Sequence, residues 1–332
     1  MRKLTLVCAL GFAACATGAL AWHNQGHMMT AEVAWQHMTP GARCRAVSLL
    51  KSEPEYARGL QNPTGIDAGQ ALFVNAATWP DRIKAQGVKV NNAPMKNDGD
   101  DAAAAGVQKQ VANNIGLDGW LHKYWHFADE AVPAVAGQKP PPINAIERIG
   151  TFSKALAAPA TPTNIKAYDL VWLIHLVGDV HQPLHIAVQF GPNFTTPAKG
   201  NDAGGNDVVV TGAPGFKELH GFWDGAPGDS KVEAKELSIS VAAADALPAP
   251  LAAKTSIKDA GVWASESHDY ADKAAYVTPI VRGSQGPFAL TPAYVANAQK
   301  IATAQVALGG VRLGNLLNAA LTWPSSECAQ AH

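Results

Sequence analysis

Residues 175–185 read HLVGDVHQPLH and place three histidines and one aspartate in a short, otherwise apolar stretch. Histidine is scarce, since the whole chain holds only 11. His175 and Asp179 are four residues apart, and on a helix this spacing stacks both side chains on one face. Pro183 disfavours helix in the residue before it, so the helix should end just after Val180. The chain can then turn and bring His185 back to the same place.

The helix that carries this motif is predicted to be buried, because residues 168–180 are apolar nearly all round. Burying imidazole and carboxylate groups without partners is energetically costly. In one interpretation, these groups merely satisfy one another in the core. Metal binding accounts for the cluster better, because imidazole and carboxylate together suit zinc.

The same spacing recurs downstream as His220-Gly-Phe-Trp-Asp224. Alone such a pair is a weak signal, but the second copy strengthens the first. Two upstream segments, Trp79-Pro80-Asp81 and residues 124–129 (YWHFAD), each set a candidate ligand among aromatic residues. Aromatic surroundings exclude water and hold ligands rigid, although each segment alone is more often core than metal site.

The N-terminus has the layout of a secretory signal peptide. Residues 1–3 (MRK) supply positive charge, LTLVCALGFAAC is an apolar run, and Ala19-Leu20-Ala21 is a small-residue cleavage site. The apolar run is short for a membrane anchor, and no other stretch is long and apolar enough to cross a bilayer. We therefore predict that residues 1–21 are removed and that the protein is secreted or periplasmic.

Cleavage would leave two cysteines, Cys44 and Cys328. In an oxidising compartment they can form one disulfide that joins the two ends of the chain, and the alternative is two free thiols. Cleavage would also create the N-terminus Trp22-His23-Asn24-Gln25-Gly26-His27. The free amine and carbonyl of Trp22 can chelate a metal in a five-membered ring, with His27 as a third ligand.

The rest of the chain is predicted to be mostly helical and to form one domain. Apolar residues recur at helical spacing over residues 28–50, 146–156 and 292–321, the last broken or kinked near Gly309-Gly310. Residues 207–210 could form a short strand or an extended edge. Residues 85–119 and 191–215 are rich in Gly, Asn, Asp and Pro and read as loops, without the low-complexity linker expected between independent domains.

Six motifs occur in order along the chain, and a seventh segment, GGVRLGNLLN, lies near its end. The six are WHNQGH (22–27), WPD (79–81), WHFAD (125–129), HLVGDVHQPLH (175–185), GGN (204–206) and LHGFWD (219–224). With them the sequence resembles the zinc-dependent single-strand-specific nucleases of fungi and plants, also called class I nucleases or 3'-nucleotidase/nucleases. These enzymes are related to the zinc-dependent phospholipases C of bacteria. The resemblance runs from Trp22 to about Leu321.

The resemblance implies an all-α domain over residues 22–332, with long loops that can include a short β-hairpin, that binds three zinc ions. The first zinc would be held by Asp81, His126, His175 and Asp179, and the second by His185, His220 and Asp224. The third would be held by the amine and carbonyl of Trp22, His27 and the bridging Asp179. His181 and His23 are not ligands in this scheme and read as outer or surface residues.

The resemblance also implies roles in catalysis and in substrate binding. Zinc ions bridged by Asp179 would share a hydroxide at neutral pH that attacks phosphorus. Asp81 is expected to act in catalysis together with Asp179. Lys84 occupies the position of a basic residue near the phosphate, and the alternative is an ordinary solvated lysine. Phe127, Asp129 and Asn206 are expected to bind the base, although Phe127 could equally belong to the core.

The expected function is a secreted phosphodiesterase that hydrolyses single-stranded RNA and DNA to 5'-mononucleotides and 3'-nucleotides to nucleosides. A phospholipase C of the same superfamily is the alternative, but those lipases usually have glutamate where this chain has Asp224. A non-catalytic zinc-binding protein is the second alternative. The net charge of −1 argues against a surface that holds polyanions by itself, so phosphate affinity must be local. We expect a monomer.

Overall fold

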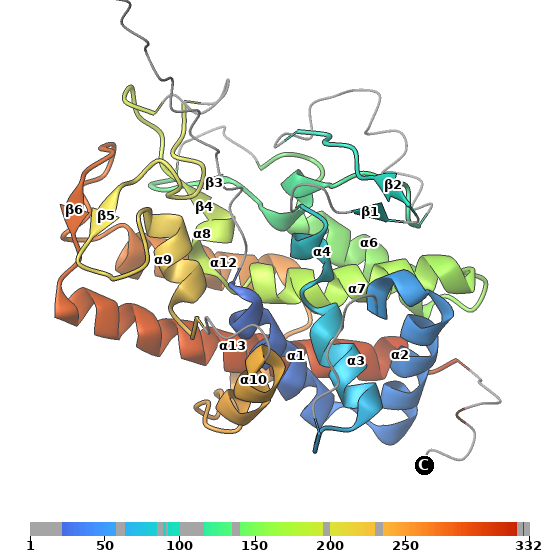
Figure 1. The fold of residues 1–332 in the computed structure, drawn as a ribbon. Coiled ribbons are helices and arrows are strands. Elements are labelled where there is room, and N and C mark those ends of the chain that lie inside the picture. Colours follow the sequence, from blue (N-terminus) through green and yellow to red (C-terminus); the bar gives the residue numbers. More distant parts are fainter. Residues whose placement is uncertain are drawn as a thin grey trace, which may run out of the picture.

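The apolar segment that leads into HLVGD forms helix α7 (Thr163–Asp179), in which every residue from Lys166 to Asp179 is buried. Helices α2 (Pro40–Ser52), α6 (Ala145–Ala157) and α13 (Pro292–Ala320) all contact it. A helix that is apolar all round must be covered on every side, and α7 runs through the middle of the molecule in Figure 1. The expected buried helix is therefore present, and it begins five residues before Tyr168.

The computed structural model describes residues 22–57, 64–84, 89–90, 92–99, 116–134, 140–194, 200–229, 235–323 and 328. The predicted signal peptide, residues 1–21, lies outside them. Helices dominate the described residues and pack as one body, which confirms the mostly helical single domain. No helix within the described ranges is long and apolar enough to span a membrane.

The first and last helices of the fold, α1 (Asn24–His37) and α13, lie side by side (Figure 1). Glycine makes this approach possible, because a Cβ built on Gly310 would lie 2.5 Å from Val33 Cβ and one on Gly314 would lie 2.9 Å from His37 Cβ. Both distances are too short for real side chains, so two glycines one turn apart let the helix backbones meet closely. Helix α10 (Glu236–Ala244) packs on α1 as well.

The remaining helical elements are short, and several of them carry the sequence motifs. They are η1 (Pro54–Ala57), α3 (Ala68–Ala76), α4 (Trp79–Arg82), η2 (Lys123–His126), α8 (Pro183–Ile186), α9 (Leu219–Gly225), α11 (Ala252–Thr255), α12 (Ala260–Tyr270) and η4 (Ala271–Ala275).

The described strands form three two-residue pairs. An antiparallel pair joins β1 (Lys89–Val90) to β2 (Ala93–Pro94), in keeping with the expected short hairpin. A parallel pair joins β3 (Glu130–Ala131) to β4 (Ala187–Val188), and another joins β5 (Val210–Thr211) to β6 (Phe288–Ala289). The β3–β4 pair connects the chain just beyond WHFAD to the chain just beyond His185.

Two helix predictions were wrong in detail. Residues 28–50 form two helices, because Met38 is extended and Thr39 caps α2 by accepting a hydrogen bond from Ala42 N, with Pro40 in the first turn. Conversely, α13 runs unbroken through Gly309-Gly310. The packing of these glycines against neighbouring elements offsets their low helix propensity.

An aromatic core supports the segments that carry the motifs. Trp172 of α7 packs edge-on against Trp79 of α4 and Trp125 of η2, with ring centroids 6.5 and 4.8 Å away. Each of these tryptophans lies within three residues of a candidate ligand, so burial of the rings fixes the backbone from which the ligands project. Near the surface, a disulfide between Cys44 and Cys328 joins α2 to the C-terminal end, which confirms the bridged alternative.

Candidate metal centre

Five histidines and three aspartates converge from six helical elements. They are His27 (α1), Asp81 (α4), His126 (η2), His175 and Asp179 (α7), His185 (α8), and His220 and Asp224 (α9). All eight side chains are buried, and they form three groups, two of which share His175, in which the candidate ligand atoms lie within 4.8 Å of one another. The structure thus brings together every side-chain ligand predicted from the sequence.

The first group surrounds the carboxylate of Asp179. Its Oδ2 lies 3.0 Å from His126 Nδ1 and 3.3 Å from His175 Nε2, which matches the expected i,i+4 stacking on α7. Asp81 Oδ1 lies 3.6 Å from His175 Nε2 and 3.8 Å from His126 Nδ1. His175 Nδ1 donates to Ala77 O at 2.7 Å, so its Nε2 presents a lone pair to both carboxylates.

The second group has the geometry that most clearly favours a bound cation. His185 Nδ1 bonds to His126 O at 2.8 Å and His220 Nδ1 bonds to Gly204 O at 2.7 Å, so each Nδ1 carries its proton. The two Nε2 lone pairs consequently face each other at 3.2 Å, with Asp224 carboxylate oxygens 3.8 and 3.5 Å away. Three acceptors in such proximity repel one another unless a cation lies between them.

The third group centres on His27, which stacks on His175 with ring centroids 3.8 Å apart. Its Nε2 lies 3.4 Å from Asp179 Oδ1, and neither His27 nitrogen has a hydrogen-bond partner among the described residues. Gly178 allows this approach, since a Cβ there would lie 2.9 Å from His27 Nδ1. A buried imidazole with two unsatisfied nitrogens is costly, which favours a further ligand at this point.

Trp22 is positioned beside both His-x-x-x-Asp motifs. Its buried indole Nε1 donates to Gly178 O at 2.9 Å, and the backbone amide of the next residue, His23, donates to Asp224 O at 3.0 Å. The backbone of Trp22 is therefore fixed between the residue that precedes Asp179 and the C-terminal ligand of α9.

Burial governs the protonation of the cluster. It lowers the pKa of all five histidines, to about 4 for His220 and well below the ordinary value for His27, His126, His175 and His185. It also raises the pKa of Asp179 and Asp224 well above that of a solvated carboxyl. Neutral imidazole is the form that binds metal, and a bound cation would favour the ionised form of both carboxylates.

Lys84 lies at the edge of the first group rather than in solvent. Its Nζ forms an ion pair with Asp81 Oδ1 at 2.5 Å, and its side chain is largely buried. A lysine three residues after Asp81 therefore places a positive charge beside the candidate ligands, as its sequence position suggested.

The three predicted base-binding residues lie in different parts of the same region. Phe127 is half-buried and stacks on His185, with centroids 4.7 Å apart, so it is not a fully buried core residue. Asn206 is half-buried and donates from Nδ2 to Ala203 O at 2.7 Å. Asp129 is half-buried, adopts a φ of +53°, and precedes strand β3.

The glycines of GGN have a structural role that the sequence did not reveal. Gly204 adopts a φ of +63°, and a Cβ there would overlap Leu184 O and lie 3.3 Å from His220 Nδ1. Its carbonyl accepts the proton of His220, so the loop orients this imidazole. Gln182 acts on the same group, because its Nε2 donates to Asp224 Oδ1 at 2.6 Å.

The other histidines among the described residues lie outside the three groups, as expected for His181 and His23. His181 is fully buried, its pKa is lowered to about 3 by burial and by Arg312, and it faces α13. His23 pairs with Asp229 at 2.9 Å.

Sequence reasoning missed His122, which is buried between two carboxylates. Its Nδ1 lies 2.9 Å from Asp98 Oδ2 and its Nε2 lies 2.9 Å from Asp118 Oδ1. Its ring stacks on Trp125, the residue before His126, at 3.8 Å. Two aspartates and a histidine spaced across a loop carry no local pattern, so no signal in the sequence could have joined them.

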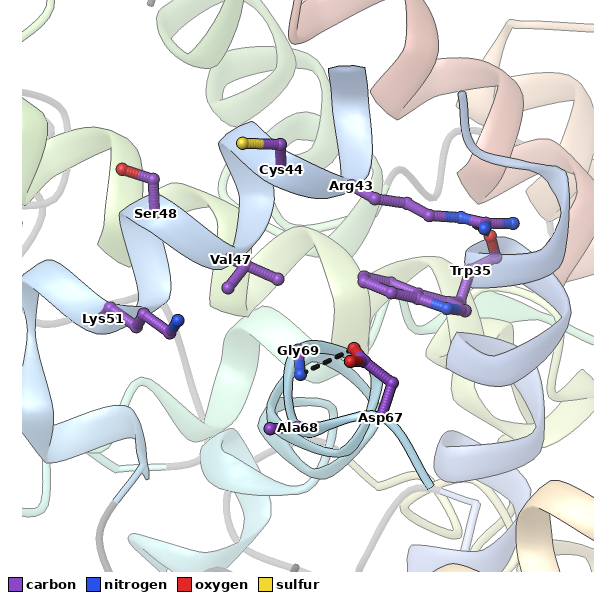
Figure 2. A pocket seen from close by; sticks show the side chains of 9 residues that line it. All are labelled: Trp35, Arg43, Cys44, Val47, Ser48, Lys51, Asp67, Ala68 and Gly69. Atoms are coloured by element: carbon purple, nitrogen blue, oxygen red, sulfur yellow. Dashed lines mark hydrogen bonds between the residues drawn. The ribbon is translucent and has the colours of Figure 1, made fainter. Parts of the chain in front are cut away.

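A groove on another part of the surface contains none of the candidate ligands. It lies between α2 and α3, where Arg43 covers Trp35 and Asp67 caps α3 through Gly69 N (Figure 2). Its lining offers no convergent set of titratable groups, so the buried clusters are the stronger candidate site.

Comparison with known proteins gives two findings. The family model described as S1/P1 Nuclease matches residues 22–322. Endonuclease 5 of Arabidopsis thaliana is 29% identical over 184 residues, which is 50% of this chain and 56% of that protein. The chain thus spans little more than half the length of this relative. The matched family range begins at Trp22, the residue predicted to follow the cleavage site.

Proposed function

Because the chain belongs to the S1/P1 nuclease family, we propose that it is a zinc-dependent endonuclease and 3'-nucleotidase. It would hydrolyse single-stranded RNA and DNA to 5'-mononucleotides and 3'-nucleotides to nucleosides. The observation that carries this proposal is the convergence of five histidines and three aspartates, all buried, from six helical elements. Family membership confirms the resemblance drawn from the ordered sequence motifs.

The donor set fits zinc. The facing lone pairs of His185 and His220 and the unsatisfied nitrogens of His27 are what neutral imidazole ligands present to a metal. We propose three ions, held by Asp81, His126, His175 and Asp179, by His185, His220 and Asp224, and by Trp22, His27 and Asp179. Bound zinc supplies Lewis acidity towards phosphoryl oxygens and an activated water at neutral pH.

The protein's own side chains would bind and orient the substrate. Lys84 pairs with Asp81 and puts a positive charge beside the clusters, where it would attract a phosphate group. Phe127, half-exposed against His185, offers a ring on which an unpaired base can stack. A duplex must first unstack a base at a cost of a few kcal/mol, so single strands should be cut faster.

Secretion and removal of residues 1–21 belong to the same proposal. Trp22 can chelate through its amine only when it is the first residue, and its side chain and neighbouring amide are already fixed beside the clusters. A protein that retains one extra methionine before Trp22 should therefore lose one zinc and most of its rate. Full activity in a protein whose N-terminus, read by mass spectrometry, begins upstream of Trp22 would refute this part.

One set of assays tests the whole proposal. Purified protein is incubated with single-stranded DNA, single-stranded RNA, a 3'-nucleotide and phosphatidylcholine, and its zinc content is measured by elemental analysis. We expect cleavage of both nucleic acids, products with 5'-phosphates and three zinc ions per chain. Products with 3'-phosphates, or DNA that resists while RNA is cut, would contradict the proposed reaction. Hydrolysis of phosphatidylcholine alone would indicate a phospholipase C, and zinc binding without hydrolysis would indicate a non-catalytic protein.

A further inference from the structure

The turn between Asp179 and His185 is held from outside by helices α12 and α13. Ser267 Oγ donates to Val180 O at 2.6 Å, and Gln305 Nε2 donates to His181 O at 3.2 Å. Both donors are buried, and Gln305 also contacts Ser267 Oγ at 3.3 Å. This turn separates a candidate ligand of the first group from one of the second, so its conformation sets how far apart they lie.

The side chain of His181 forms a second contact between α13 and the same turn. Its Nδ1 bonds to Val177 O at 2.7 Å, so the proton is on Nδ1 and Nε2 can accept. Arg312 Nη1 donates to that Nε2 at 3.0 Å. The rest of the guanidinium is also engaged, with Nε donating to Lys254 O at 3.1 Å and Nη2 pairing with Glu266 at 2.9 Å.

The GGVRLG segment of α13 (residues 309–314) leaves room for the ring of His181. Gly309 lies one helical turn before Arg312, and a Cβ there would lie 3.1 Å from His181 Cγ. Gly309 thus makes room for the ring that Arg312 binds, and Gly310 brings the same helix against α1, which carries His27. Helix α13 therefore contacts both the turn between Asp179 and His185 and the helix that carries His27.

Simple helix packing does not require this arrangement. Burying a guanidinium beside an imidazole carries a desolvation cost that an apolar pair of similar volume would avoid. The polar arrangement adds a fixed orientation, because the planar guanidinium of arginine constrains its hydrogen-bond partners in angle as well as in distance.

We propose that Arg312, acting through His181, is a positioning residue of the metal centre. With Gln305 and Ser267 it holds residues 180–182 in one conformation and so fixes Asp179 relative to His185. The inference rests on the proposed zinc binding by these two residues. Partners outside the ligand shell typically change metal affinity by about 10- to 100-fold, and for a contact relayed through the backbone we expect the lower end, about tenfold.

The test compares Arg312→Met with Asn315→Ala. Methionine keeps the length of the side chain without its donors. The control removes a hydrogen bond from the same helix, between Asn315 Nδ2 and Thr255 O at 3.1 Å, which does not reach the 180–182 turn. Zinc affinity is measured by competition with a chelator, and the visible absorption of the Co²⁺-substituted proteins reports ligand geometry. The unfolding midpoint of each metal-free protein measures general destabilisation.

We expect Arg312→Met to bind zinc about tenfold more weakly and to change the Co²⁺ spectrum, while Asn315→Ala leaves both unchanged. Wild-type affinity in Arg312→Met, or an equal loss in Asn315→Ala, would overturn the inference. If Arg312→Met does not fold, Gln305→Leu tests the same turn with the same two outcomes. Wild-type protein that binds no zinc would instead refute the proposed function itself, and this inference with it.

Discussion

Gly204→Ala should weaken the second ligand group without replacing any candidate ligand. Gly204 has a φ of +63°, and its carbonyl accepts the Nδ1 proton of His220 at 2.7 Å. Alanine is strained in this left-handed region by roughly 1–2 kcal/mol. Its Cβ would also overlap Leu184 O, a backbone atom that no rotamer change can move. Such overlap typically costs about 1–3 kcal/mol, and the loop can relieve it only by shifting the carbonyl away from His220.

Gly200→Ala is the matched control, because Gly200 has the same φ of +63° and, among the described residues beyond its chain neighbours, no atom lies within 4 Å of the Cβ position. The backbone strain is common to both variants, so their difference isolates the overlap, about 1–3 kcal/mol. Part of that difference should appear in zinc affinity, at about tenfold for each 1.4 kcal/mol. Zinc content and chelator competition measure the loss of zinc affinity, and urea unfolding of the metal-free proteins measures the loss of stability. Equal values for the two variants in all three measurements would refute the reasoning.

Three further predictions concern the metal centre and its surroundings. Asp179→Asn should lose metal and activity together. Asn206→Ala should raise KM or slow turnover with its zinc content unchanged. Zinc loss in Asn206→Ala would contradict the assignment of Asn206 to substrate binding. Burial lowers the pKa of the His220 imidazole to about 4, so protonation of this imidazole should compete with metal only as the pH falls towards that value. A bound cation favours the ionised form of Asp224, so zinc should persist below pH 6.5. Elemental analysis after equilibration at stepped pH checks this, and half-loss near pH 6.5 would contradict it. His122→Asn should destabilise the protein by about 3–5 kcal/mol in urea unfolding, because Asp98 and Asp118 lose a buried charged partner. Burial lowers the pKa of His122, but the hydrogen bonds to the two carboxylates outweigh burial and raise this pKa overall. The stability that His122 contributes should therefore be complete below pH 6.5 and be lost as the pH rises through the raised pKa. A variant as stable as the wild type at pH 6 would contradict a charged His122 between the two carboxylates.

The sequence by itself predicted the candidate ligands, because metal chemistry restricts both residue type and local spacing. His175 with Asp179, and His220 with Asp224, lie four residues apart, and one turn of helix is enough to bring each pair to a single face. The buried helix was predictable for a similar reason, since its apolar residues leave no face for water. Both inferences depend only on neighbours in the chain, whose geometry follows from the helix itself.

Tertiary structure decided the interactions between residues far apart in the chain. The tautomers of His175 and His220 are set by Ala77 O and Gly204 O, which the fold brings from other segments. The unbroken α13 likewise depends on its packing against α1, because contact between helices outweighed the weak helix propensity of two glycines. Arg312 is far from the ligands in sequence, and only the packing of α13 brings its guanidinium to His181. Hydrogen bonds and packing act over a few ångströms in space, so contacts between separate segments of the chain leave no periodic pattern in the sequence.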